Sequence, residues 1–143
     1  MREILFRGKA NCEGRDNEWV YGGLLPETEN TFPIIVRDYD NDEDWIGING
    51  WETVAPETVG QYTGLTDKYG KRIFEGDIVK HYNNSDDGFD IGALYWDETF
   101  SQWKRTSIGN FHSRTFTYTM SRSCEYEVIG NIHDNPELMK GGE

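Results

Sequence analysis

Short apolar segments separated by turn residues dominate the pattern of this chain. No window keeps the spacing of three and four residues that marks an amphipathic helix. Runs of this kind, bounded by Gly, Pro, Asn and Asp, predict strands and tight turns. The expected strands cover residues 4–6 (ended by Gly8), 19–24, 32–36, 45–48, 78–82, 89–96, 102–105, 115–120 and 126–130. The pattern therefore predicts an all-β fold.

Residues 56–79 carry the clearest local signals. Apolar side chains stand on both sides of the turn from Asp67 to Gly70, where Asp can bond the backbone two residues on and Gly supplies a positive φ. This is the pattern of a β-hairpin. Gly76 and Asp77 mark a second turn before the next strand, in the way that small SH3-like barrels begin theirs. An acid at the start of a strand usually caps backbone amides, so we expect Asp77 to do this.

Two short helical turns are expected, each with Pro at its first position. One lies at residues 56–59, and the other begins at Pro136 with Asn135 as its cap. No linker divides the chain, and we place a boundary near Thr58. The prediction is an N-terminal β subdomain over residues 1–58, packed with an SH3-like β-barrel subdomain over residues 59–143 that ends in the short helical turn.

Four blocks of sequence carry a family resemblance: residues 2–9, 19–22, 56–79 and 127–138. In this order and together they resemble the YopX family of phage and prophage proteins. The resemblance implies a β-rich, phage-encoded protein with no established activity.

Charge and composition limit the function classes. The chain carries a net charge of −12, so as a whole it repels phosphate backbones, and bulk nucleic-acid binding is disfavoured. Cys12 and Cys124 are too few for a disulfide framework or a zinc site, and we expect two free thiols. The sequence shows neither a signal peptide nor a membrane span, which predicts a cytoplasmic location in a bacterial host and no membrane partner.

Candidate catalytic and metal-binding residues each have a structural interpretation that we favour. The acids of residues 38–44 imitate the start of a calcium loop, but its sixth and twelfth positions hold Glu43 and Asn49, so we expect a solvated acidic turn between two strands. His81, His112 and His133 lack metal-ligand spacing. The sequence therefore predicts no catalytic residue, no metal and no cofactor.

The strongest charge asymmetry lies between Thr99 and Cys124, where four basic residues occur without one acid. This segment is +4, so the rest of the chain carries −16. Basic side chains interleaved with aromatic ones could hold single-stranded nucleic acid, or pair with an acidic surface of the same chain, of a second copy or of another protein. We favour charge complementarity within the chain or its oligomer.

The candidate interaction surface combines this segment with an exposed aromatic anchor. The chain has five tryptophans, most of them expected in the core, and Trp51 is the first candidate for exposure in a turn. The candidate residues are Trp51, Trp103, Lys104, Arg105, His112, Arg114 and Arg122.

The sequence thus favours a non-catalytic accessory protein that binds another protein or a second copy of itself. The first alternative is a protein that engages nucleic-acid machinery, either by holding single strands along the ribbon from Lys104 to Arg122 or by mimicking DNA with its acidic body. The second alternative is an enzyme whose catalytic groups converge only in the fold.

Overall fold

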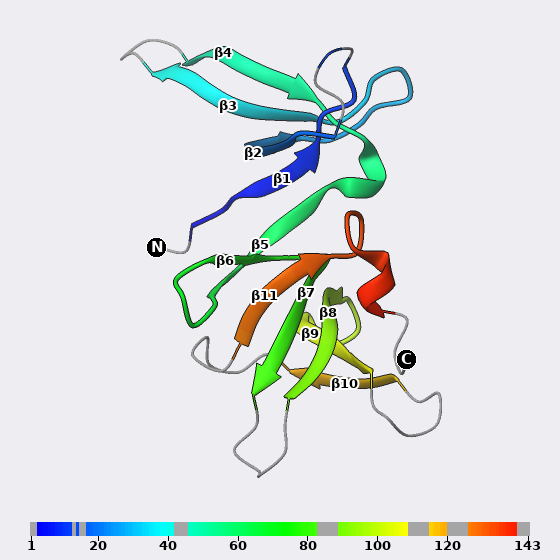
Figure 1. Cartoon of the computed structure of the whole chain (residues 1–143). Coiled ribbons are helices and arrows are strands. Elements are labelled where there is room, and N and C mark those ends of the chain that lie inside the picture. Colours follow the sequence, from blue (N-terminus) through cyan, green and yellow to red (C-terminus); the bar gives the residue numbers. More distant parts are fainter. Residues whose placement is uncertain are drawn as a thin grey trace. The chain divides into compact units, whose positions relative to one another are not determined.

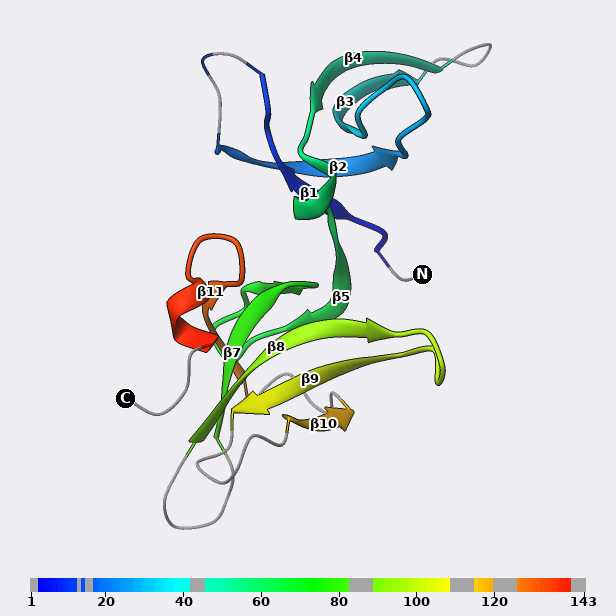
Figure 2. The ribbon, with the colours of Figure 1, turned by 90° about the vertical axis from the view of Figure 1, so that its right-hand side faces the viewer.

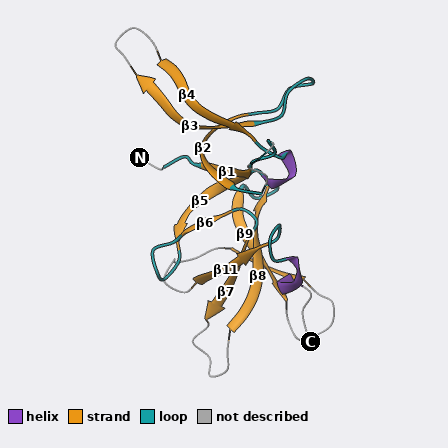
Figure 3. Cartoon of the chain, turned by 45° about the horizontal axis from the view of Figure 1, so that its top comes forward, coloured by secondary structure: helices purple, strands orange, loops and turns teal. Residues whose placement is uncertain are grey.

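The computed structural model describes residues 3–12, 14, 17–41, 46–82, 89–108, 115–119 and 126–139. Strands dominate these residues, and the helical parts are two short 3-10 turns (Figure 3). The elements are β1 (Phe6–Lys9), β2 (Trp19–Leu25), β3 (Ile34–Asn41), β4 (Ile46–Thr53), η1 (Pro56–Thr58), β5 (Gly60–Thr66), β6 (Arg72–Phe74), β7 (Asp77–Tyr82), β8 (Phe89–Asp97), β9 (Gln102–Ile108), β10 (Thr115–Thr119), β11 (Tyr126–Asn131) and η3 (Pro136–Met139). The all-β prediction is confirmed.

The contacts divide the chain into two units, residues 1–62 and 63–143. The change falls within β5, which carries the chain from one unit into the next. The sequence placed the boundary near Thr58, at the end of η1. The SH3-like barrel expected for the second part stays a prediction.

The first unit contains an antiparallel sheet in which β4, β3, β2, β1 and β5 follow one another (Figure 1). Side chains alternate between its two faces. Val20, Ile35 and Val54 are buried together on one face, and Phe6, Leu24 and Val59 pack around them. This cluster holds β1 to β4 together.

The first strand differs from its prediction. β1 begins at Phe6 and runs through Gly8, whereas Ile4 lies outside the strand and is largely exposed. A Cβ atom on Gly8 would stand 2.9 Å from the buried side chain of Val54. Gly8 therefore does not end the strand; its missing side chain lets Val54 pack directly onto β1.

The second unit contains a sheet in the order β10-β9-β8-β7-β11. β8 and β9 form a long hairpin (Figure 2). The core of this unit consists of Ile73, Val79, Leu94 and Tyr126, with Leu65 and Val128 beside them. The core thus draws on β6, β7, β8 and β11.

Both expected helical turns form. η1 has Pro56 at its first position, and Thr58 Oγ1 accepts a hydrogen bond from Lys9 N at 2.9 Å, which fastens η1 to β1. η3 begins at Pro136. The side chain of Asn135 bonds back to Asn131 N at 3.3 Å. It therefore closes the loop before η3.

The acidic residues 38–44 do not form one turn. β3 continues through Asn41, so Asp38 and Asp40 lie in the strand opposite Gly50 and Gly47 of β4. Residues 42–44 lie outside the described residues. Among the residues that the structure describes, no helix is long and apolar enough to cross a bilayer.

Candidate interaction surface

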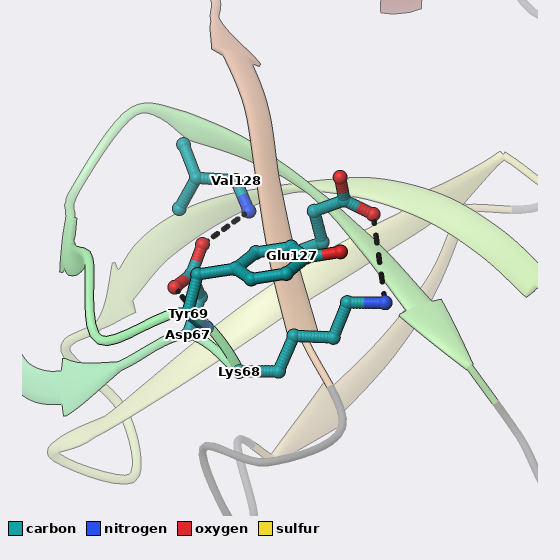
Figure 4. A network of polar contacts seen from close by, with 5 residues as sticks. All are labelled: Asp67, Lys68, Tyr69, Glu127 and Val128. Atoms are coloured by element: carbon teal, nitrogen blue, oxygen red, sulfur yellow. Dashed lines mark hydrogen bonds and ion pairs between the residues drawn. The ribbon is translucent and has the colours of Figure 1, made fainter.

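Within residues 56–79, Asp67 lies in the first turn and bonds backbone groups. Asp67 is 5% exposed, and its carboxylate accepts backbone N–H bonds from Tyr69 at 2.9 Å and from Val128 at 3.1 Å (Figure 4). It also accepts the N–H of Lys71 at 2.9 Å. Lys68 N donates to Tyr126 O at 2.9 Å. Gly70 has the positive φ that the turn requires, 83°. The carboxylate therefore fastens the β5–β6 turn to the outer edge of β11.

The second turn uses its acid in the same way. Asp77 is almost fully buried, and its Oδ2 accepts the N–H of Phe74 at 2.8 Å. Gly76, with φ of 88°, donates its N–H to Leu94 O and accepts the N–H of Ile132, both at 2.9 Å. The expected capping role of Asp77 is confirmed, and this turn joins β8 to the C-terminal loop.

In the last of the four blocks, residues 127–138, Asn131 also bonds groups of its own turn. Asn131 Oδ1 accepts the N–H groups of His133 and Asp134, and its side-chain amide donates to Asp134 Oδ2 at 3.0 Å. Gly130 leaves room for this loop, because a Cβ atom there would stand 2.6 Å from Asn135 Oδ1. The side chains of Asp67, Asp77 and Asn131 thus accept backbone N–H groups.

The histidines do not form a metal site in the part of the chain that is described. His81 Nδ1 lies 3.1 Å from Arg105 Nη2, and its ring lies 4.9 Å from that of Tyr126. A guanidinium only donates, so Nδ1 accepts and the ring proton of a neutral His81 sits on Nε2. No group of three or more His, Cys, Asp or Glu suited to a metal occurs among the described residues. His112 lies outside them.

Lys104 of the basic segment is held by an acid on the neighbouring strand. Its Nζ lies 2.6 Å from Asp97 Oδ2 and 4.6 Å from the ring centre of Phe100. Asp97 Oδ1 accepts the N–H of Thr99 at 2.8 Å, in the turn between β8 and β9. The bond from Lys104, more than the burial that opposes it, lowers the pKa of Asp97 below its ordinary value.

Arg105 points to the opposite face of β9 and is only 2% exposed. Trp103 is half-buried and meets Trp96 edge to face, with ring centres 5.0 Å apart. Arg114 and Arg122 lie outside the described residues, as does His112. The two described cations of the segment are therefore engaged within the sheet and do not form a solvent-facing pair.

The first unit presents a different kind of surface. Leu25, Ile34, Val36 and Trp51 line a small, open and almost wholly apolar hollow. Leu25 pairs with Ile34, and Val36 pairs with Trp51, so the four side chains come from neighbouring positions on β2, β3 and β4. Trp51 is 53% exposed. Its exposure was expected, but it lies in a strand and not in a turn.

Gly22 and Gly23 show how closely each face of the sheet is packed beside the hollow. Gly23 stands opposite Val36 on the exposed face, and a Cβ atom there would meet nothing within 4 Å. Gly22 faces the other way, and its Cβ would stand 1.9 Å from Val36 O. The inner face is therefore closely packed where the outer face is open.

The sequence did not reveal three of the four residues of this hollow. Leu25, Ile34 and Val36 belong to apolar runs that are also typical of a core. Only the cross-strand register places them beside Trp51. Conversely, simple alternation shows that Lys104 and Arg105, as neighbours in a strand, cannot share a face.

The described residues thus form two antiparallel sheets, with a small apolar hollow on the first. Other exposed apolar side chains, such as Tyr69 and Phe100, lie in the second unit. A family model described as "YopX protein" matches residues 6–140. The chain belongs to the YopX family, as the resemblance indicated.

The chain is similar to the structure described as "Crystal structure of protein EF1440 from Enterococcus faecalis", with a TM-score of 0.56 and 24% identity over 97% of this chain and 99% of that one. At this identity the likeness concerns the fold alone. No curated protein matches the chain.

Proposed function

We propose that this protein is a non-catalytic binding module that docks on another protein, or on a second copy of itself, through the hollow lined by Leu25, Ile34, Val36 and Trp51. The exposure of Trp51 in this apolar setting is the observation that carries the proposal. Large aromatic side chains beside apolar pockets are the usual anchors of protein interfaces. Such a hollow on a sheet face is a docking surface because burying it removes apolar area from water.

The arrangement of the charged residues supports binding over catalysis. The buried carboxylates of Asp67 and Asp77 accept backbone N–H groups, so they are committed to turns and not to substrates. Holding single-stranded nucleic acid along the basic segment is less favoured, because Lys104 is paired with Asp97 and Arg105 is buried.

A site-specific photo-crosslinker tests the proposal. A benzophenone side chain in place of Trp51 is irradiated in the purified protein alone and in a bacterial lysate treated with nuclease. The matched control carries the same group in place of Tyr69, which is 72% exposed in the β5–β6 turn. We expect covalent protein adducts from position 51 and none from position 69. Equal adducts from both positions, or none from 51, would contradict the proposal.

A further inference from the structure

We propose that the occupant of the hollow is a positively charged segment of another protein, which binds in an extended conformation along the edge of β4. Every second side chain of this segment would be apolar and would lie over the hollow. The inference rests on the proposed function and specifies the chemistry of its partner. Its support comes from the edge of β4, from the shape of the apolar face and from the charge around it.

β4 is the last strand of its sheet (Figure 1). Val54 N donates to Pro33 O at 3.0 Å, which makes these two residues a hydrogen-bonded pair. In an antiparallel ladder such pairs alternate with pairs whose N–H and C=O groups point outward. One and three positions along the register, the backbone groups of Thr53 and Trp51 therefore point away from β3.

Another segment of the chain already uses the first of these two positions. Asn11 N donates to Thr53 O at 3.2 Å, and Ala10 forms a bridge with Val54. Within the described residues, these backbone contacts stop at Thr53, two pairs before Trp51, and the thiol of Cys12 donates to Glu52 Oε2 at 3.4 Å on the residue between them. An added strand would lie beyond Thr53 on this edge, and Trp51 would supply its first backbone bonds.

The hollow fits the side chains of such a strand. Trp51 lies on the outermost strand, with Val36 beside it on β3 and Gly23 beyond Val36 on β2. A strand placed next to β4 would direct every second side chain to this face, at the spacing of the sheet itself. Apolar side chains at those positions would cover the exposed part of Trp51.

The charge of the first unit favours a basic partner. Residues 1–62 contain five Lys and Arg against thirteen Asp and Glu, a net charge of −8. Glu27 and Glu29 are exposed in the loop that follows Leu25. Of the basic residues, Arg37 is paired with Glu52 at 3.3 Å and Arg7 is buried against Trp19. A second copy would bring a further −8 to the same face, so like charges disfavour it.

Binding of designed peptides tests the inference. The probe is an eight-residue peptide of alternating Lys and Val with blocked ends, and its affinity is measured by calorimetry at low salt. The matched peptides replace Lys by Glu, replace Val by Ser, or carry N-methyl groups on alternate amides. We expect the Lys–Val peptide to bind and each of the others to bind at least about tenfold more weakly, since each loses one component of the interaction.

Charge variants of the protein test whether Glu27 and Glu29 attract the Lys–Val peptide. Glu27→Lys with Glu29→Lys is expected to weaken binding of the Lys–Val peptide about threefold to tenfold. Glu98→Lys with Glu137→Lys changes the net charge equally at exposed positions of the other unit, so it should stay within about twofold of the wild type. Equal losses in both double variants would overturn the inference.

The other outcomes separate the inference from the proposed function. One outcome is that the Glu–Val peptide binds as tightly as the Lys–Val peptide, with Trp51→Ser abolishing the binding of both peptides. That result would contradict a basic partner but would leave the hollow as a docking site. Undiminished binding of the N-methylated peptide would exclude edge pairing. A dimer that depends on Trp51 in sedimentation would make a second copy the occupant. If Trp51→Ser leaves the affinity for every peptide unchanged, both the inference and the proposed function fail.

Discussion

β11 and β4, one edge strand of each sheet, differ in how far other parts of the chain cover them. The edge of β11 is closed by the β5–β6 turn, because Asp67 Oδ2 accepts Val128 N and Lys68 N donates to Tyr126 O. The edge of β4 is covered at Thr53 and Val54, and within the described residues this cover does not extend to Trp51. Covered edges prevent unwanted strand pairing, and open edges permit it. The difference supports the proposal that a partner docks on the first sheet, whereas Asp67 holds the edge of the second sheet closed.

The largest expected effect concerns the closed inner face beneath the open one. Gly22→Ala should lower the free energy of unfolding by about 3 kcal/mol, because the new Cβ collides with Val36 O and forces β2 from β3. Gly23→Ala, one residue on, should stay within about 0.5 kcal/mol of the wild type. Urea denaturation measures both. Similar losses in the two variants would show that the exposed face is also packed.

The closed edge should depend on Asp67. Asp67→Ala is expected to lower the free energy of unfolding by about 3 kcal/mol, since three backbone N–H groups lose their acceptor. Asp67→Asn keeps one acceptor oxygen and should lose about half as much. Hydrogen exchange at the Val128 amide should become faster in the Ala variant. A loss below about 0.5 kcal/mol would mean that the turn is held mainly by other contacts.

The ion pair of Asp97 and Lys104 should make a smaller contribution to stability, and this contribution should depend on pH. Because Lys104 lowers the pKa of Asp97 in the folded protein, the ionised carboxylate stabilises the fold above its ordinary pKa, near pH 4. This contribution is lost as the pH falls through the lowered folded value. Wild type should therefore exceed Asp97→Asn in stability at pH 7, and the difference should shrink below about pH 4. If the stability difference between wild type and Asp97→Asn grew in acid, the prediction would be contradicted.

The smallest effect on stability should come from the open edge. Trp51→Ser removes a side chain that is already half exposed, so we expect the thermal midpoint to change by only a few degrees, about 0.5 kcal/mol or less. Loss of peptide binding with the fold retained would separate the function of this surface from stability. Unfolding of the variant would place Trp51 in the core instead.

Local chemistry made the turns predictable. Asp67, Gly70, Gly76 and Asp77 act on backbone groups within a few residues of themselves, so their types and spacing sufficed. The distant bond from Asp67 to Val128 was not predictable, because it joins residues 61 positions apart. Local signals therefore predicted the hairpin but not the edge that it closes.

The hollow was only partly predictable for a related reason. The exposure of Trp51 was expected, yet the fourth strand was expected to end at Ile48, whereas β4 runs to Thr53. The register of β3 and β4 shifts twice between Val36 and Tyr39. Such irregularities decide which side chains become neighbours, and apolar periodicity does not show them.

Amide chemical shifts of the protein, recorded by NMR during titration with the Lys–Val peptide, test the proposed docking surface most directly. The described geometry predicts that the largest changes occur at Trp51 and its β4 neighbours, with smaller ones at Gly23 and Val36, and none along β8 and β9. Changes centred on Lys104 and Trp103, or no saturable change at Trp51, would contradict a binding surface on the first sheet.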